Sequence, residues 1–137
     1  MRILIMGLPG AGKSTLAAAL TWQLFPNCLW LNADTVREKY NDWDFSTEGR
    51  IRQSLRMRQL ADDSDKKYVI ADFVAPLPEM RINFEPDFIV WVDTIQESEY
   101  SDTNKMFVKP ESVDVRVTTQ DADYWADLIG KKVFDFQ

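Results

Sequence analysis

A glycine-rich segment near the N-terminus, Gly7-Leu8-Pro9-Gly10-Ala11-Gly12-Lys13-Ser14, constrains the fold of this 137-residue chain more than any other feature. It fits the pattern G-x-x-x-x-G-K-[ST], in which glycines let the backbone wrap closely around phosphate oxygens. The pattern needs a buried strand before it and a helix after it. The apolar run 3–6 and the leucines spaced by four residues over 16–24 supply both. The segment is therefore predicted to be a phosphate loop of the Walker A type. The alternative, a glycine turn with a surface lysine, leaves Lys13-Ser14 unexplained.

Each part of this loop has an expected task. Backbone N–H groups and the N-terminus of the following helix would face the phosphate anion. Lys13 would bridge the β- and γ-phosphates, the Ser14 hydroxyl would bind Mg²⁺, and Thr15 would contact the α-phosphate. ATP and Mg²⁺ are thus the expected cofactors. The residues expected to bind the nucleotide are Gly7, Pro9, Gly10, Ala11, Gly12, Lys13, Ser14 and Thr15.

Strands and helices alternate along the rest of the chain, which is typical of an α/β domain with a parallel sheet. We expect one P-loop kinase domain over 1–137, with the three-layer α/β/α fold of P-loop NTPases and nucleotide kinases. Its five-stranded parallel sheet should have the order 2-3-1-4-5. The proline-rich segment 74–86 is predicted to be mostly loop, and the polar segment 95–110 a short lid. The other strands are expected at 28–31, 68–73, 88–92 and 113–117, and the main helices at 14–24, 35–40, 47–63 and 118–130.

The last predicted helix has a start signal and a stop signal. Thr118 and Asp121 have the spacing of a capping box, and Gly130 suits a helix C-terminus. The tail 131–137 carries further apolar residues. Those residues either pack on the core or meet a partner, and both alternatives stay open.

Composition narrows the chemistry further. The chain has no histidine and one cysteine, Cys28, which excludes a histidine general base, an internal disulfide and a multi-cysteine metal site. Its net charge is −6, from 16 basic and 22 acidic residues, which argues against non-specific binding to nucleic acid or an anionic membrane. No apolar run is long enough to span a bilayer. We expect a cytoplasmic protein that acts on a small molecule, and a homodimer stays open.

Two aspartates follow predicted strands, at the edge of the sheet where ligands of parallel α/β folds bind. Asp34 could take the proton of an acceptor hydroxyl or organise Mg²⁺; alternatively, it caps the helix that begins near Thr35. Asp72 ends a run similar to a Walker B strand. We expect it to be a carboxylate on the metal side of the site, the alternative being an ordinary turn residue.

Basic residues could supply local positive charge despite the acidic total. Six arginines are candidates for anion contacts, although most of them are expected to be solvated helix charges: Arg37, Arg50, Arg52, Arg56, Arg58 and Arg81. Lys105 lies in the segment 95–110, where it could meet transition-state charge when a lid closes. The alternative is that this segment is a flexible acidic loop.

Four blocks in the same order and spacing resemble the adenylyl-sulfate (APS) kinase family. The first is the phosphate loop through Ala17. The second, Leu31-Asn32-Ala33-Asp34-Thr35-Val36-Arg37, resembles L-D-G-D-x-V-R. The others are Phe45-Ser46 with Arg50, similar to G-F-S-x-x-x-R, and Phe73-Val74-Ala75-Pro76 with Arg81, similar to F-I-S-P-Y-R-x-x-R.

This resemblance implies ATP-dependent transfer of a phosphoryl group to the 3′-hydroxyl of adenylyl sulfate. It makes Asp34 the catalytic carboxylate, with Lys13 on the transferred phosphate. Arg37 and Arg50 would hold the phosphosulfate of the acceptor, Phe45 would stack on its adenine, and Arg81 would lie near the same site.

The chain departs from this family pattern at several positions, as a divergent member such as a small phage-type kinase would. Asn32 replaces an aspartate, Ala33 a glycine and Gln53 an asparagine, and Ala75 replaces a serine, which excludes a phosphoserine there. The segment 102–109 is only loosely similar to a lysine-rich lid. Two further readings therefore stay open: a kinase of another hydroxyl (nucleoside, sugar or polynucleotide 5′ end), and a nucleotide-binding regulator or NTPase without an acceptor.

Overall fold

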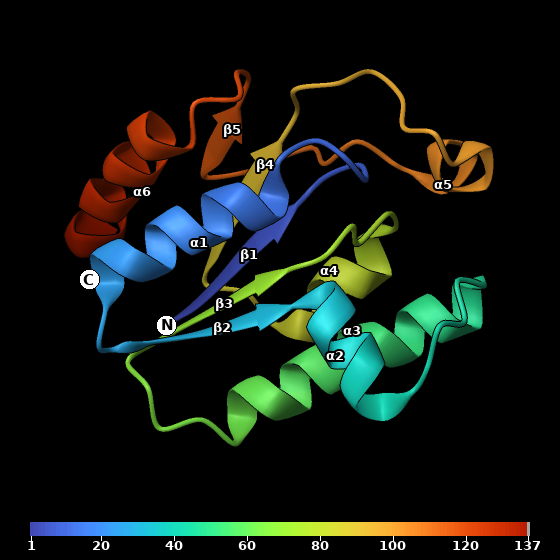
Figure 1. The fold of residues 1–137 in the computed structure, drawn as a ribbon, viewed down its shortest axis with the longest axis horizontal. Coiled ribbons are helices and arrows are strands. Elements are labelled where there is room, and N and C mark those ends of the chain that lie inside the picture. The colour runs from blue at the N-terminus through green and yellow to red at the C-terminus, as the bar shows by residue number, and fades with distance from the viewer. Residues whose placement is uncertain (137) are drawn as a thin grey trace.

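Five parallel strands form the central sheet (Figure 1). The structure is a computed structural model that describes residues 1–136. The strand order is β2-β3-β1-β4-β5, which confirms the predicted order and the parallel sheet. The strands are β1 (Arg2–Met6), β2 (Cys28–Asn32), β3 (Tyr68–Asp72), β4 (Phe88–Val92) and β5 (Val115–Val117).

Helices cover both faces of the sheet, which confirms the three-layer α/β/α architecture (Figure 1). On one face lie α1 (Lys13–Leu24) and α6 (Ala122–Phe136), which pack against each other. On the other lie α2 (Ala33–Tyr40), α3 (Thr47–Asp62) and α4 (Pro78–Phe84). The short α5 (Ser101–Met106) lies beyond the ends of the strands, on the side of the phosphate loop.

Alternate residues of the central strands fill two separate cores. In β1, Ile3 and Ile5 pack toward α1 and α6, whereas Leu4 and Met6 pack toward α3 and α4. All four side chains are fully buried. A strand that is buried on both faces has no polar alternation, which is why β1 reads as a continuous apolar run.

The predicted first and last residues of α6 were wrong: the helix begins and ends further along the chain than the sequence signals indicate. The helix begins at Ala122, and Asp121 rather than Thr118 caps it: its Oδ1 accepts a hydrogen bond from the Tyr124 N–H at 3.3 Å. The helix also continues through Gly130 to Phe136. Gly130 is buried against α1, where an added Cβ would lie 2.8 Å from the Gln23 side chain, so this glycine serves close helix packing.

The segment 74–86 also contains more helix than predicted. Pro78 begins α4, a position where the missing N–H of proline costs nothing. Met80 and Phe84 are then fully buried in the core under α3. Core packing therefore stabilises a helix that the prolines alone did not indicate.

The C-terminal segment packs on the core through part of its apolar residues, which is one of the two alternatives left open by its sequence. Val133 is fully buried in the core, and Phe136 packs edge-on against Phe88 with ring centres 5.8 Å apart. Phe134 is exposed. Gln137 lies outside the described residues.

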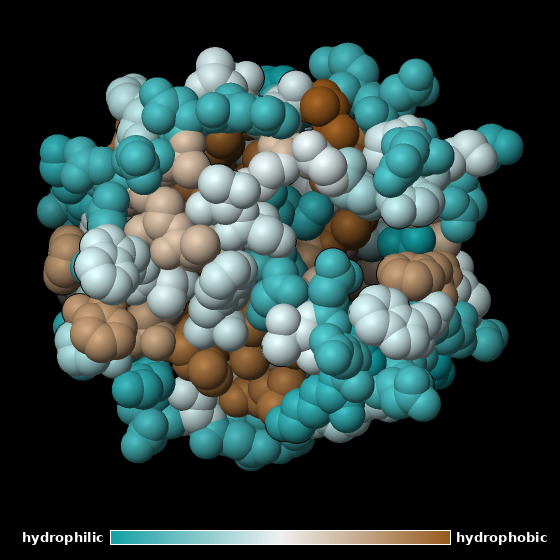
Figure 2. Space-filling model, in the orientation of Figure 1, coloured by the Kyte–Doolittle hydropathy of each residue, from teal (hydrophilic) through white to brown (hydrophobic). Residues whose placement is uncertain are grey.

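Hydrophilic side chains separate the hydrophobic patches on the face shown in Figure 2. No helix within residues 1–136 is both long enough and apolar enough to cross a bilayer.

Candidate active site

The phosphate loop connects β1 to α1, and its backbone requires glycine where it passes the end of β4. Gly7 has φ +151°, and an added Cβ would lie 2.4 Å from the Val92 carbonyl oxygen. Gly12 precedes α1 with φ +108°, a conformation that other residues rarely adopt. The loop therefore places Lys13 and Ser14 in the first turn of α1, where the N–H groups of a helix remain free for an anion.

Lys13 is a buried cation without an ion-pair partner among residues 1–136. It is 9% exposed, and its Nζ donates a hydrogen bond to the Leu8 carbonyl oxygen at 3.0 Å. Burial lowers the Lys13 pKa to about 8, although the charges of Asp72 and Asp34 act in the opposite direction. A bound phosphate would supply the missing counter-charge.

A cavity of about 390 Å³ opens beside this loop, at the carboxyl ends of the strands. Its lining brings together segments that are far apart in the sequence. Pro9, Gly10, Lys13 and Ser14 come from the loop and α1, and Asp72 and Ala75 from the end of β3. The others include Asn32, Asp34, Arg37, Phe45, Arg50 and Gln53 from β2 to α3, and Tyr100, Asp102 and Thr103 at α5.

The two predicted carboxylates differ in their surroundings, and Asp34 is the free one. It is exposed in the first turn of α2 and lines the cavity, and no hydrogen bond or ion pair within residues 1–136 engages its side chain. The alternative reading of Asp34 as the helix cap is wrong, because Asn32 caps α2 by accepting a hydrogen bond from the Thr35 N–H at 3.1 Å.

Asp72, by contrast, is held by several neighbours and is only 2% exposed. Its Oδ2 accepts hydrogen bonds from Trp30 Nε1 at 2.6 Å and from Asn32 Nδ2 at 3.2 Å. Its Oδ1 lies 3.4 Å from the donating Ser14 hydroxyl. Burial raises the Asp72 pKa, while these donors and Lys13 act to lower it. Asp72 is therefore part of the phosphate-loop site and not an ordinary turn residue.

Arg37 and Arg50 line the opposite side of the cavity, where they are 4% and 7% exposed. Their hydrogen bonds reach only neutral oxygens: Arg37 donates to the carbonyls of Asp42 and Asp44 at 3.1 Å, and Arg50 donates to Phe45 O at 2.8 Å and to Thr103 Oγ1 at 2.7 Å. Neither guanidinium has an ion-pair partner within residues 1–136, and burial lowers the pKa of both. Two desolvated cations without a counter-ion favour an anionic ligand.

An aromatic ring lies next to these two arginines. The guanidinium carbons of Arg37 and Arg50 are 4.2 and 5.4 Å from the centre of the Phe45 ring. Phe45 lines the cavity and is partly exposed. The structure thus brings together three of the residues that the resemblance assigned to the acceptor.

Gln53 contributes a polar atom that sequence reasoning did not foresee. It is 2% exposed, and its Nε2 donates to the Ala33 carbonyl oxygen at 3.1 Å. Its Oε1 has no hydrogen-bond partner within residues 1–136, although Gln53 lines the cavity. A buried acceptor without a donor is costly to the stability of the fold.

A second, smaller cavity of about 190 Å³ lies on the other side of the phosphate loop. Ala11, Gly12 and Thr15 line it, together with Gln120 and Trp125 near the start of α6. The loop therefore separates two cavities. Lys13 and Ser14 face the larger one, and Thr15 faces the smaller one.

A family profile described as adenylylsulphate kinase matches residues 1–124, which is most of the chain. The chain belongs to the adenylylsulphate kinase family. A search among curated proteins found no match. Family membership and fold together support an ATP-dependent small-molecule kinase.

Solved kinase structures share the fold at low sequence identity. The APS kinase of Mycobacterium tuberculosis, in complex with AMPPNP and APS, is 21% identical with a TM-score of 0.77, and the match covers 98% of this chain and 95% of that one. The shikimate kinase of Aquifex aeolicus is 16% identical (TM-score 0.70; 98% and 97% covered). A gluconokinase of Sinorhizobium meliloti 1021 is 12% identical (TM-score 0.66; 98% and 95% covered).

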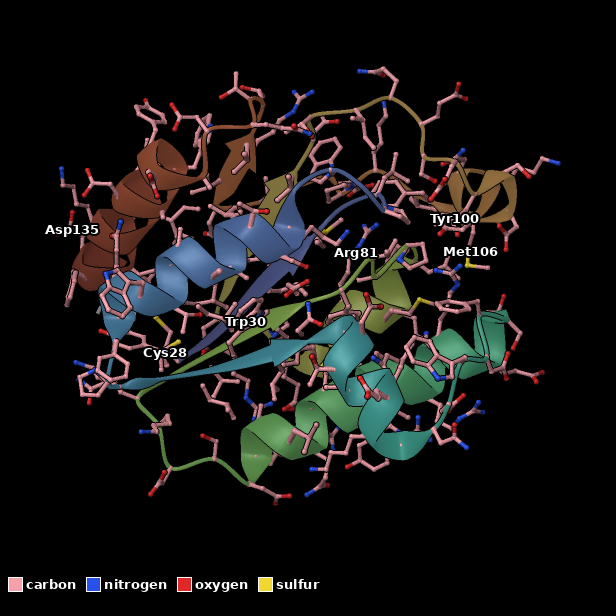
Figure 3. All side chains as sticks on the ribbon, in the orientation of Figure 1. Cys28, Trp30, Arg81, Tyr100, Met106 and Asp135 are labelled. Atoms are coloured by element: carbon pink, nitrogen blue, oxygen red, sulfur yellow. The ribbon has the colours of Figure 1, made fainter. Side chains whose placement is uncertain are left out.

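Two residues expected at the acceptor site of an adenylylsulphate kinase do not line the cavity. Arg81 is buried behind it and donates hydrogen bonds to the carbonyls of Ala75 at 2.9 Å, Pro76 at 3.2 Å and Val108. These hydrogen bonds of Arg81, labelled in Figure 3, connect the segment 95–110 to the loop after β3. Lys105 is exposed on α5 and is likewise absent from the cavity lining. Neither side chain lines the cavity in this structure, so a contact of Arg81 or Lys105 with an acceptor stays a prediction.

We expect the Arg81→Met variant to lose about 3 kcal/mol of unfolding free energy, because buried carbonyls lose their charged donor. Denaturant unfolding measures this loss. The matched control is Arg58→Met, which removes exposed ion pairs with Asp62 and Glu85 and should cost less than about 1 kcal/mol. Equal stability of the two variants would contradict the role given to Arg81.

Proposed function

We propose that this protein transfers the γ-phosphoryl group of Mg·ATP to a hydroxyl of a small anionic acceptor, and that adenylyl sulfate is this acceptor. The observation that carries the proposal is the pair of buried, unpaired arginines, Arg37 and Arg50, beside Phe45 and across the cavity from the phosphate loop. The charge and shape of the cavity support an acceptor with an anionic group and a flat ring.

The donor phosphates would lie along the phosphate loop, with Lys13 on the β- and γ-phosphates. This orientation leaves the smaller cavity, near Thr15 and Trp125, for the nucleoside. The loop thus directs the γ-phosphate toward the larger cavity and its acceptor.

The side chains beside the phosphate loop have the oxygen atoms that a bound Mg²⁺ needs. Ser14 offers a hydroxyl oxygen, and Asp72 Oδ1 lies behind it at 3.4 Å. Within residues 1–136 no three acidic, histidine or cysteine side chains cluster as a metal cage. Mg²⁺ commonly uses one or two protein ligands together with substrate phosphates. When bound, the ion would neutralise charge on the β- and γ-phosphates.

Asp34 would accept the proton of the acceptor hydroxyl as the new oxygen–phosphorus bond forms. The bond from the γ-phosphorus to the β–γ bridging oxygen breaks, and ADP leaves. Asp34 suits this task because it lines the cavity and its carboxylate has no partner within residues 1–136. The positive charges of Lys13 and Arg37 on either side would stabilise the transferred group.

The rest of the acceptor would be held by the far side of the cavity. Arg37 and Arg50 would bind its phosphosulfate, and Phe45 would stack on its adenine. The M. tuberculosis APS kinase, crystallised with APS, is the fold relative that motivates this acceptor.

A second candidate acceptor is a hydroxy acid, because two arginines can also bind a carboxylate. An assay of ADP release with adenylyl sulfate, shikimate, gluconate and a nucleoside separates these candidates. We expect only adenylyl sulfate to stimulate ADP release strongly. If only a hydroxy acid stimulates ADP release, that hydroxy acid is the acceptor and adenylyl sulfate is not. If none of the compounds changes the rate of ADP release, the protein is an NTPase without an acceptor.

The Arg37→Met variant tests the acceptor site directly. We expect its KM for adenylyl sulfate to rise by about 10- to 100-fold, because a charge-assisted contact is lost, while its KM for ATP stays unchanged. The control, Arg58→Met, removes an exposed arginine on α3 and should change neither KM. An unchanged KM for the acceptor in Arg37→Met would contradict the proposed site.

A further inference from the structure

A carboxylate and an amide face each other at the ends of two neighbouring strands. Asn32 and Asp72 are direct partners in the β2–β3 register, and both are the last residues of their strands. The Asn32 Nδ2 donates to Asp72 Oδ2 at 3.2 Å and lies equally close, at 3.2 Å, to Ser14 Oγ. One side chain thus contacts both the hydroxyl and the carboxylate that flank the phosphate loop.

Trp30 adds a second neutral donor to the same carboxylate oxygen. Trp30 packs against the core under α1 (Figure 3). Asn32 lies two residues further along the strand, so its side chain is on the same face of the sheet. The Trp30 Nε1 donates to Asp72 Oδ2 at 2.6 Å. Because Oδ2 receives both donors, the carboxylate cannot rotate freely, and Oδ1 is the oxygen that faces Ser14.

The amide of Asn32 has a further connection through its oxygen. Asn32 Oδ1 accepts the Thr35 N–H at 3.1 Å and so fixes the start of α2, the helix that carries Asp34. An aspartate at position 32 would cap this helix equally well. It would, however, bring a second negative charge into contact with Asp72, and two adjacent carboxylates repel each other.

We propose that Asn32 and Trp30 are positioning residues that hold the Asp72 carboxylate toward Ser14. The Asn32–Asp72 pair must carry a single negative charge, which can reside on either strand. This inference rests on the proposed kinase function for the task of Ser14. It assigns a role to two residues that are not among the proposed anion-binding side chains. What the site requires is the total charge of the Asn32–Asp72 pair, not the identity of either residue.

Exchanging the two side chains tests the single-charge requirement. Asp72→Asn removes the charge, Asn32→Asp doubles it, and the double variant Asn32→Asp/Asp72→Asn moves it to the other strand. We expect the affinity for Mg·ADP to fall by about 10- to 100-fold in Asp72→Asn and to recover most of that loss in the double variant. A double variant that binds as weakly as Asp72→Asn would overturn the proposal.

Thermal unfolding with Mg²⁺ alone supplies a readout that needs no turnover. Asn32→Asp should unfold at a lower temperature than wild type in EDTA and regain stability on addition of MgCl₂, because the ion relieves the repulsion. Wild type and the double variant should respond little to Mg²⁺. An Asn32→Asp variant with wild-type stability and no response to Mg²⁺ would overturn the proposal.

The tryptophan is tested with a matched pair of variants. Trp30→Phe removes the Nε1 donor, and we expect Mg·ADP affinity about 10-fold below wild type. Trp22→Phe, at an exposed position on α1, should leave the affinity unchanged. Equal affinities of both variants for Mg·ADP would remove Trp30 from the proposal.

The binding and unfolding experiments do not depend on an acceptor. If no acceptor is phosphorylated, only the proposed function is refuted, and these experiments still test the roles of Asn32 and Trp30.

Discussion

Replacing Asp34 by asparagine is expected to lower turnover by about 10²- to 10⁴-fold, the usual contribution of a positioned proton acceptor. Asparagine has nearly the same shape but cannot take the proton of the acceptor hydroxyl. Because the Asp34 side chain is exposed and makes no hydrogen bond or ion pair within residues 1–136, the variant should fold normally. Steady-state rates with saturating ATP and adenylyl sulfate measure the effect.

The control for Asp34→Asn lies on the same helix. Glu38→Gln makes the same change of acid to amide at an exposed position of α2 that does not line the cavity. Its turnover should match wild type, and both variants should bind ATP as wild type does. Normal transfer by Asp34→Asn would remove the catalytic assignment of this residue.

Nucleotide affinity is expected to weaken as pH rises above about 8, the pKa to which burial lowers Lys13. Phosphate binds the protonated form, so affinity should fall by up to tenfold per pH unit above that value, until the raised pKa of the bound state is reached. Lys13→Met should bind about 100-fold more weakly at neutral pH and lose this pH dependence. Calorimetric titration with ATP at several pH values measures both effects.

The same burial has the opposite consequence for stability without nucleotide. The Lys13 pKa is lower in the folded protein than its ordinary value of 10.5, so the unfolded chain binds more protons between about pH 8 and that value. This group therefore destabilises the unliganded protein below about pH 8, and the penalty is relieved as pH rises. Lys13→Met should raise the unfolding free energy at neutral pH by about 2 kcal/mol.

An exposed lysine provides the comparison for Lys13. Lys131→Met, which removes a surface pair with Asp127 on α6, should change neither nucleotide affinity nor its pH dependence. If Lys13→Met retains wild-type affinity, or if it is less stable than wild type without nucleotide, the description of Lys13 as an unpaired buried cation is wrong.

Features determined by local sequence could be predicted well. The phosphate loop was evident because β1, the glycines and α1 each have their own short-range signal. The N-cap of α3 at Ser46 is equally local: its side chain accepts a hydrogen bond from the Gly49 N–H at 3.1 Å. The strand order was predicted from the P-loop kinase fold that the phosphate loop indicates, and the structure confirms it.

Features determined by pairing across the fold could not be predicted in the same way. Asp72 was found because it ends a strand, but its partners Trp30 and Asn32 depend on the β2–β3 register between residues 40 positions apart. The free Oε1 of Gln53 likewise depends on where α3 meets the start of α2. No local pattern indicates either arrangement.

Arg81 shows that a motif match can place a residue near a site without indicating the contacts it makes there. The resemblance put Arg81 near the acceptor, and it does contact Ala75 and Pro76, which line the cavity. Its guanidinium is directed to backbone carbonyls there, because the turn after β3 leaves them buried and Val108 approaches from the other side. That turn, with Ala75 at φ +47°, has no signal in the sequence.

The most direct test of the central claim follows the γ-phosphoryl group itself. The protein is incubated with Mg²⁺, γ-labelled ATP and adenylyl sulfate, and the labelled products are separated. We predict that the label appears on adenylyl sulfate in an amount equal to the ADP formed, and that Asp34→Asn slows this transfer by about 10²- to 10⁴-fold. Label found only in inorganic phosphate, with ADP formation unaffected by adenylyl sulfate, would contradict the claim.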